Sequence, residues 1–378
     1  MPIKRNILLN PGPATTTDKV KMAQVVPDIC PREDEFVQIM SGIRKDLLKV
    51  VNGNNKEYST VLISGSGTAA MESSIASVVN KEKTLLILIN GAYGDRMQDI
   101  AKAYSLPFKT IEYNYGESIN FDEVKIFINN NSDIGYLAMV HHETTTGILN
   151  SITSFSKLGK KFNLTLILDA ISSYAGLQID LKKTPIDYLI STSNKCLQGM
   201  AGLAFVICNQ QKLSSLKNVP KRSYYLDLYD SYQMAKKSNQ MRFTPPVQVI
   251  YALRTAIDEF FVEGMKNRYK RYQSNMQLLR TRLNDLGFEF LLNAKDESNI
   301  LLSIQEPTDM QFSFQEMHDF LYSNGITIYP GKILNKKTFR LAIIGDLHKS
   351  DIEKTILLIE KYLQKKKLIN NLYTRSSI

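Results

Sequence analysis

Between residues 59 and 208 the chain alternates short apolar, β-branched runs with segments of helical periodicity, and this alternation restricts the fold more than any other feature. The runs are hydrophobic almost throughout, as is typical of strands in a mostly parallel sheet that is covered on both faces. The predicted strands are Val61–Ile63, Thr84–Ile89, Ile134–Val140, Leu164–Leu168, Tyr188–Ile190 and Ala204–Ile207. The predicted helices between them are Thr68–Val79, Tyr93–Tyr104 and Thr153–Phe162. We therefore expect an α/β domain whose ligand lies at the carboxyl ends of the strands.

The pattern changes after Thr244-Pro245-Pro246 and indicates a smaller α+β unit. We expect, in order, a long charged helical stretch at Val247–Leu286, strands near Phe288–Leu292 and Ile300–Ile304, a helix at Phe314–Ser323, a strand pair around Ile326–Tyr329 and Phe339–Ala342, and a last helix at Asp351–Leu363. Residues 364–378, which include three consecutive lysines, are expected to form a flexible basic tail without structure.

Composition excludes several classes of protein. The 378 residues are 43% hydrophobic and 22% charged, which is ordinary globular usage and is enough to bury a large core. Three cysteines, at positions 30, 196 and 208, cannot form a disulfide framework and point to a reducing compartment. The start of the chain has no apolar run of signal-peptide length, and no segment approaches the roughly 20 apolar residues of a membrane span. We expect a soluble, cytoplasmic protein that does not bind membranes.

The net charge of +10 permits two interpretations. It reflects either well-solvated surface lysines or a positive field that attracts small anions. Nucleic acid is not expected as a partner, because no arginine-rich stripe interleaved with aromatic residues occurs. The histidines at positions 141, 142, 318 and 348 and the scattered cysteines show no metal-ligand spacing, so no metal is expected; the adjacent pair is interpreted as structural, with one ring near a ligand.

Four features follow or lie within predicted strands, and each also has a purely structural interpretation. Gly65-Ser66-Gly67-Thr68 opens a helix and suits a phosphate, but it is equally a plain strand-to-helix turn. Asp169 closes a buried strand, where a carboxylate needs a cationic partner, although turn and N-cap aspartates are common. Lys195 follows another buried strand and is either a desolvated amine able to form a Schiff base or a surface lysine. Arg340 lies in an apolar strand. It is either a surface charge on an edge strand or a guanidinium directed at a ligand's acid group.

Together the four features predict a pyridoxal 5′-phosphate site. This cofactor needs a phosphate cradle, a carboxylate for its pyridine nitrogen and a lysine for covalent attachment, and an amino-acid substrate adds the need for an arginine. At this point the chain resembles the class V aminotransferases of fold type I and, within them, the 2-aminoethylphosphonate–pyruvate transaminase family. The resemblance covers roughly residues 5–363 and rests on the strings Leu8–Pro13, Gly65–Thr68, Asn90–Gly94, His142–Gly147, Asp169–Ser173, Ser193–Cys196, Arg242–Pro246, Tyr329–Lys332 and Phe339-Arg340.

The resemblance implies a fold and a division into domains. It implies a large cofactor-binding α/β domain at residues 14–258, with a mostly parallel seven-stranded sheet sandwiched by helices. A small α+β domain at residues 259–363 is expected to be joined by the N-terminal segment 1–13. The implied reaction moves the amino group of 2-aminoethylphosphonate to pyruvate in a ping-pong cycle, giving phosphonoacetaldehyde and L-alanine.

The resemblance also assigns roles to residues. Lys195 would carry the cofactor as a Schiff base and shuttle the proton, and Asp169 would pair with the pyridinium. The remaining cofactor residues would be Ser66, Gly67 and Thr68 at the phosphate, Thr244 from a partner subunit and Asn194 beside them, Tyr93 stacked on the ring, and Thr144 near the 3-oxygen or the substrate. Arg340, assisted by backbone near Gly12, would hold the substrate's acid group. The role of Thr244 implies a homodimer with shared active sites.

Some features depart from the family pattern and leave alternatives open. Met200–Leu203 and the two tyrosines of Arg222–Asp227 differ from the expected residues and concern substrate detail more than cofactor binding. An alanine–glyoxylate or serine–glyoxylate transaminase would share every cofactor residue. A cysteine desulfurase is disfavoured, because no cysteine follows Cys208 to act in the second domain. A non-catalytic binding protein on the same fold would not need Lys195, Asp169 and Arg340 together.

Overall fold

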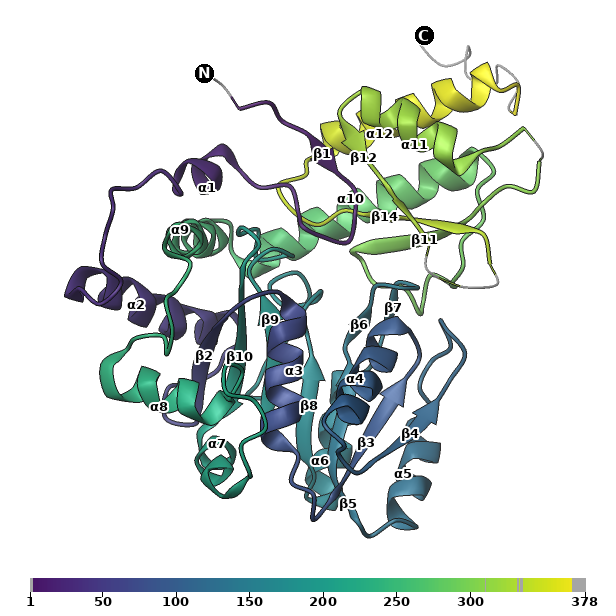
Figure 1. Cartoon of the computed structure of the whole chain (residues 1–378). Helices are drawn as coiled ribbons and strands as arrows, with labels where there is room; N and C mark the ends of the chain where they lie inside the picture. The colour runs from purple at the N-terminus through teal and green to yellow at the C-terminus, as the bar shows by residue number, and fades with distance from the viewer. Residues whose placement is uncertain (1–2, 310, 332, 334–335, 369–378) are drawn as a thin grey trace.

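A seven-stranded sheet forms the centre of the computed structural model, which describes residues 3–309, 311–331, 333 and 336–368. Its strand order is β2-β10-β9-β8-β5-β3-β4 (Figure 1). All pairings are parallel except those of β10, which runs antiparallel to both β2 and β9. The strands are β2 (Tyr58–Ser64), β3 (Thr84–Ile89), β4 (Phe108–Glu112), β5 (Ile134–Val140), β8 (Thr165–Asp169), β9 (Tyr188–Thr192) and β10 (Leu203–Asn209). This arrangement confirms the α/β fold class.

Helices cover both faces of this sheet, and the sequence of β3 shows why. Leu86 and Leu88 belong to the core on one face, whereas Leu85, Ile87 and Ile89 belong to the core on the other. Both side-chain directions of the strand are therefore buried, which explains its continuous hydrophobicity. One core is shared with α2 (Asp34–Val50), α5 (Phe121–Asn129), α6 (Ile152–Phe162) and α9 (Val247–Glu263). The opposite core is shared with α3 (Gly67–Val78), α4 (Ala92–Ala103), α7 (Gln210–Ser215) and α8 (Leu228–Ser238).

The predicted strands and helices of residues 59–208 are confirmed to within a few residues. The strand β4 was not predicted. Its Lys109 and Thr110 interrupt the apolar pattern, which an edge strand tolerates because one side of it meets solvent. The helix α2 was also missed, since it precedes the alternating region.

The second unit contains a three-stranded sheet of order β11-β14-β13 and a short parallel pair between β1 and β12, which Figure 1 shows beside three helices. Its strands are β11 (Leu301–Gln305), β12 (Ile326–Thr327), β13 (Tyr329–Pro330) and β14 (Thr338–Ala342), with β1 (Ile7–Leu8) from the N-terminal segment. Its helices are α10 (Met265–Asp285), α11 (Phe314–Ser323) and α12 (Lys349–Lys365).

Several expectations for this unit were wrong in detail. The stretch 247–286 is two helices rather than one, because Gly264 between them adopts a φ of 77°, which interrupts a helix. Residues 288–292 form no strand and contribute one isolated bridge, between Phe290 and Ile304. Residues 326–329 belong to two strands, of which β12 pairs with β1 and only β13 pairs with β14. The last helix extends to Lys365, and residues 369–378 of the expected tail lie outside the described part.

The N-terminal segment packs with the C-terminal unit. Ile7, Leu9 and Ala14 share an apolar cluster with residues of α10, β11, β14 and α12. The predicted boundary between residues 258 and 259 falls within α9, whose Phe260 packs in the core of the large sheet. The division into domains at 14–258 and 259–363 stays a prediction. Among the described helices none is long and apolar enough to cross a membrane.

Candidate active site

A cavity of about 160 Å³ lies at the carboxyl ends of β5, β8 and β9, beside the first turns of α3 and α4. Seven of the residues singled out from the sequence line it: Ser66, Gly67, Thr68, Tyr93, Asp169, Asn194 and Lys195. His142, from the histidine pair of which one ring was expected near a ligand, also lines it. The remaining lining residues were not predicted: Arg96, Val140, Ile171, Ser172 and Thr192. The fold thus brings together residues that are up to 129 positions apart, from Ser66 to Lys195.

One wall of the cavity is the turn that starts α3. Gly65 has a φ of 143°, a conformation that favours glycine, and a Cβ at Gly67 would lie 2.8 Å from Cδ1 of Ile171. Ser66 occupies the N-cap position, but its side chain does not cap its own helix. The Arg96 guanidinium donates to Oγ1 of Thr68 at 3.3 Å. Backbone N–H groups, hydroxyls and a cation therefore meet at one helix N-terminus, and this combination suits a phosphate.

Asp169 ends β8 and is 3% exposed. Its Oδ1 accepts a hydrogen bond from the backbone N–H of Ile171 at 2.7 Å. Burial raises the pKa of Asp169 to about 6, against the lowering effects of that hydrogen bond and of the charges of Arg96 and Lys195. A carboxylate held in this way is costly unless a cation comes close to it, and a protonated pyridine nitrogen would be such a cation.

Lys195 follows β9 and is covered by the N-terminal segment. Its Nζ donates a hydrogen bond to the backbone carbonyl of Pro11. At the next residue, Gly12, a Cβ would lie 2.4 Å from Cδ of the lysine, and the φ of 117° also favours glycine there. The Gly12 that the sequence assigned to the substrate site therefore lies against the lysine side chain.

Arg340 lies in the middle of β14 and is 1% exposed, so it is not an edge-strand surface charge. Its Nε donates to the carbonyl of Pro330 at 3.0 Å, and its Nη1 donates to the carbonyl of Thr144 at 2.9 Å. Burial lowers the pKa of Arg340. The second contact ties the small sheet to the segment that follows β5. Lys332 of the Tyr329–Lys332 string lies outside the described residues.

Neither Thr144 nor Thr244 lines the cavity. The Oγ1 atom of Thr144 is buried and has no hydrogen-bond partner in the described structure. Thr244 is separate from the residues that line the cavity in the single chain. Its neighbour Phe243 stacks on Tyr225, with ring centroids 4.8 Å apart.

Glu143 was not predicted, and it organises this region. Its Oε2 accepts from the backbone N–H groups of Tyr93 and Gly94 at 3.1 and 3.4 Å, and its Oε1 accepts from the Thr145 hydroxyl at 2.8 Å. A Cβ at Gly91 would lie 2.0 Å from Cγ of Glu143, so the close approach requires glycine. Burial raises the pKa of Glu143 to about 7. The carboxylate takes the place of an N-cap for α4 and thereby fixes the backbone that carries Tyr93.

His142 lines the cavity and belongs to the adjacent histidine pair, of which one ring was expected near a ligand. Its Nε2 lies 2.7 Å from Oγ of Ser298, and burial lowers its pKa to about 3, so the ring is neutral. Its Nδ1 is buried without a partner among the described residues. The signal that could have indicated the roles of His142 and Glu143 is position, because they lie two and three residues beyond β5, at the sheet edge where Asp169 ends β8.

The residues present fit pyridoxal 5′-phosphate. The α3 turn offers donors to a phosphate, Asp169 offers a buried acid to a cationic ring nitrogen, and Lys195 offers the amine. The unpartnered Nδ1 of His142, a lining residue, remains for a ring substituent or the substrate. No group of metal-ligating side chains occurs in the described residues.

Comparisons with known proteins agree with this geometry. The family model described as "Aminotransferase class-V" matches residues 20–342. A 2-aminoethylphosphonate–pyruvate transaminase of Bacteroides fragilis is 38% identical over 362 residues, covering 95% of this chain and 99% of that protein. A bifunctional phosphonoacetaldehyde hydrolase/aminoethylphosphonate transaminase of Clostridioides difficile is also 38% identical, over 361 residues and 95% of this chain. The match spans 56% of that longer protein.

Solved structures share the fold. The alanine–glyoxylate aminotransferase of Nostoc sp. has a TM-score of 0.89 and 26% identity, covering 96% of each chain. The pyridoxamine–pyruvate aminotransferase of Mesorhizobium loti has a TM-score of 0.88 and 20% identity, covering 97% of this chain and 93% of the other.

Proposed function

This chain belongs to the class V aminotransferase family, and we propose that it moves the amino group of 2-aminoethylphosphonate to pyruvate, giving phosphonoacetaldehyde and L-alanine. Its cofactor is pyridoxal 5′-phosphate. The substrate assignment is supported by relatives named for this reaction that match 38% of residues over nearly their whole length. The observation that carries the proposal is the joint presence of Lys195, Asp169 and the α3 turn in one cavity.

Each of these residues has a task in the proposed reaction. When bound, the cofactor withdraws electrons from the substrate carbon that carries the amine. Asp169 would hold the ring nitrogen protonated through a buried charge pair, which matters most for a substrate whose reacting carbon carries no carboxylate. The Nζ of Lys195 would accept a proton from the substrate carbon and return it, as a general acid and base. Ser66 and Thr68 would bind the phosphate, with Gly67 allowing the close approach.

Arg340 is proposed to bind the acid group of both substrates in turn, the phosphonate of one and the carboxylate of the other. A guanidinium suits both because it offers several donors in a planar fork. The hydrogen bonds to Pro330 and Thr144 hold that fork in place, and the second sets it beside the Thr144 hydroxyl. Backbone near Gly12 would complete the substrate site.

The active unit is proposed to be a homodimer in which Thr244 serves the partner's phosphate. Beside Thr244 lies an exposed aromatic cluster of Tyr224, Tyr225 and Phe243. Tyr224 is 74% exposed, and the Arg242 guanidinium lies 4.8 Å from the centre of its ring. Clustered aromatic and arginine side chains are characteristic of protein interfaces. The cytoplasm is the proposed location, because Cys30, Cys196 and Cys208 are free thiols.

The test is a panel of single amino donors. Holoenzyme is mixed separately with 2-aminoethylphosphonate, taurine, alanine and serine, and loss of the visible cofactor band is followed. We expect 2-aminoethylphosphonate and alanine to convert the cofactor to its amine form, since they are the donors of the forward and reverse reactions. Conversion by serine with glyoxylate as the preferred acceptor would favour the glyoxylate-type reaction of the Nostoc structure instead. Failure of every amine would favour a non-catalytic binding protein.

A further inference from the structure

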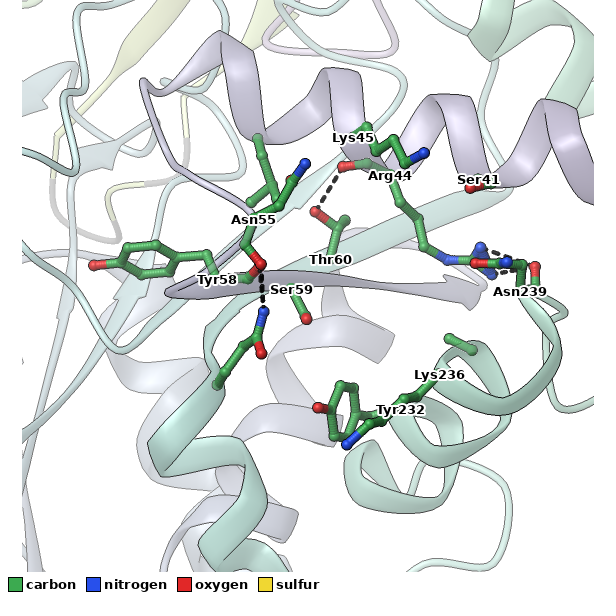
Figure 2. Close-up of a pocket in the computed structure, with 13 residues that line it drawn as sticks. Ser41, Arg44, Lys45, Asn55, Tyr58, Ser59, Thr60, Tyr232, Lys236 and Asn239 are labelled. Carbon is green, nitrogen blue, oxygen red and sulfur yellow. Dashed lines mark hydrogen bonds between the residues drawn. The ribbon is translucent and has the colours of Figure 1, made fainter.

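A second polar cavity, of about 260 Å³, lies at the outer edge of β2, away from the active site. β2 is the terminal strand of the large sheet, so one of its sides has no strand partner in the described structure. The helices α2 and α8 close this side, as Figure 2 shows through Arg44 of α2 and Lys236 of α8. Gln210 of α7 also lines the cavity. We call this cavity the β2-edge pocket. It shares no lining residue with the active-site cavity.

Arg44 is the buried cation of the β2-edge pocket, with 8% of its surface exposed. Figure 2 shows its side chain running from α2 to Asn239, where Nη1 and Nη2 donate to one backbone carbonyl at 2.8 and 2.6 Å. Its Nε is buried and has no partner among the described residues. Burial lowers the pKa of Arg44 to about 10. Asn239 caps the end of α8, and a helix end supplies only about half a negative charge, so the arginine is incompletely neutralised.

The lining of the pocket adds positive charge and supplies no acid. Lys45 and Lys236 are its other charged residues, and no aspartate or glutamate lines it. The uncharged polar side chains are Ser41, Asn55, Tyr58, Ser59, Thr60, Gln210, Tyr232 and Asn239. These include hydroxyls from α2 and β2 and amides from three segments. The Thr60 hydroxyl already donates to the carbonyl of Arg44, and the Gln210 amide to the carbonyls of Asn55 and Tyr58. The Ser41 and Ser59 hydroxyls remain as donors to an anion, one from α2 and one from β2.

Other buried arginines show what this chain does with a desolvated guanidinium. Arg268, 1% exposed, donates to the carboxylate of Glu263 at 2.7 Å. Arg340 has no carboxylate within ion-pair distance in the described structure and is the residue that we expect to bind a substrate's acid group. Arg44 resembles Arg340 in this respect, because its recorded hydrogen bonds go to a backbone carbonyl. A buried cation without an acid costs free energy unless an external anion comes to it.

We propose that the β2-edge pocket is a second ligand site that binds a small tetrahedral oxyanion, a phosphate or phosphonate group, with Arg44 as its buried anchor. Lys45 and Lys236, both exposed, would approach the anion from the rim, and the Ser41 and Ser59 hydroxyls would donate to its remaining oxygens. Donors spread over several elements suit a tetrahedral group better than a flat carboxylate. The inference is independent of the proposed reaction, because it uses none of the catalytic residues.

The pocket is connected to one segment of functional interest. Asn239, which accepts both hydrogen bonds from Arg44, lies five residues before Thr244, the residue proposed to serve the partner's phosphate. An anion on Arg44 would therefore act at the start of the segment 240–244. The proposal concerns binding of the anion to the β2-edge pocket, and any change in transaminase turnover would be a consequence of that binding.

The experiment is a titration of holoenzyme with inorganic phosphate by isothermal calorimetry, so that the cofactor's own phosphate already occupies the α3 turn. We expect a saturable phosphate site that persists in Arg340→Lys and is therefore distinct from the proposed substrate site, with methylphosphonate competing and acetate binding at least about tenfold more weakly. Arg44→Met should weaken phosphate binding at least about tenfold, and Lys236→Ala a few-fold. Lys237→Ala is the matched control, because it removes an exposed lysine of the same helix from outside the pocket and should leave binding unchanged.

Three results would overturn the proposal. They are the absence of saturable binding up to about 10 mM phosphate, unchanged affinity in Arg44→Met, and equal weakening by Lys236→Ala and Lys237→Ala, which would reveal only a general charge effect. If Arg44→Met does not fold, the double variant Lys45→Ala/Lys236→Ala decides, since both lysines are exposed. That double variant should bind phosphate at least about fivefold more weakly and keep its transaminase activity.

Discussion

The active-site cavity and the β2-edge pocket both contain buried positive charge, but they differ in what accompanies it. In the active site, the charges of Arg96 and Lys195 act on Asp169 and that of Glu143 acts on Arg340, although no carboxylate pairs directly with Arg340 in the described structure. In the β2-edge pocket Arg44 has only the end of α8 as its counter-charge. The first arrangement suits a ligand that carries both signs, with a cationic ring and an anionic phosphate. The second suits an anion alone.

This difference shows how the position of a charge in the fold decides its cost. The active-site acids lie at the carboxyl ends of parallel strands, where several segments converge and can be balanced by ligands and neighbouring residues. Arg44 lies at a sheet edge, where the nearest acceptors belong to a helix terminus. The following variants test how far the active-site charges depend on one another, in contrast to an isolated cation.

The largest effect is expected from Lys195→Ala. Removing the amine removes both covalent attachment of the cofactor and the proton carrier, so kcat should fall by at least about 10⁴-fold. Borohydride reduction followed by peptide mass spectrometry should then find no cofactor on the chain. Lys160→Ala, an exposed lysine on α6, is the matched control and should keep wild-type activity. Cofactor attached at another lysine in the first variant would refute the assignment.

Asp169→Asn should lower kcat by about 10³-fold, because the neutral amide cannot hold the ring nitrogen protonated. It should also stabilise the cofactor-free protein. Burial raises the pKa of Asp169 to about 6 from an ordinary value of 3.8, so the folded chain keeps this proton to higher pH than the unfolded chain does. The stability contributed by this group is therefore present below about pH 4 and lost as pH rises through about 6.

The measurement is urea unfolding of both cofactor-free proteins across this pH range. At pH 8 the Asp169→Asn variant should be more stable than wild type by about 3 kcal/mol, and the gap should close near pH 4. A gap that does not change with pH would mean that Arg96 and Lys195 already compensate the carboxylate without the cofactor, so that the active site, unlike the β2-edge pocket, is balanced without its ligand.

Arg340→Lys should raise KM for both 2-aminoethylphosphonate and pyruvate by about 10- to 100-fold, with a smaller change in kcat. Lysine keeps the charge but cannot reproduce the hydrogen bonds to Pro330 and Thr144 together with a fork for the ligand. Arg5→Lys, at an arginine paired with Asp351 in the same unit, is the control for the substitution itself. A change in KM for only one substrate would show that the two acid groups have separate anchors.

The smallest effect is expected from Glu143→Gln. The amide has fewer acceptor sites than the carboxylate for the N–H groups of Tyr93, Gly94 and Thr145. The first turn of α4 should therefore be less stable. We expect a fall in kcat of about tenfold and a loss of stability of about 1–3 kcal/mol. Glu117→Gln, at an exposed glutamate, should change neither. Normal kcat with reduced stability would mean that Glu143 supports the fold without positioning Tyr93.

Much of the site could be predicted because its residues follow strands whose hydrophobic pattern is unmistakable. Asp169 is the last residue of β8 and Lys195 lies three residues after β9, and parallel strands bring their carboxyl ends to one edge. Glu143 and His142 occupy the same kind of position but were not singled out as ligand-binding residues. Their roles depend on contacts with Tyr93 and Ser298, which are 50 and 156 positions away along the chain.

The sequence by itself determined the α/β class, the sheet-covering helices of the central region and the identity of the candidate lysine, acid and phosphate turn, because periodicity and strand ends are local properties. Only the tertiary structure decided that Pro11 and Gly12 cover Lys195, that Glu143 caps α4, and that Arg44 is buried without an acid. These contacts depend on which distant segments pack together and on how completely the packing excludes water. A local pattern of residue types predicts neither.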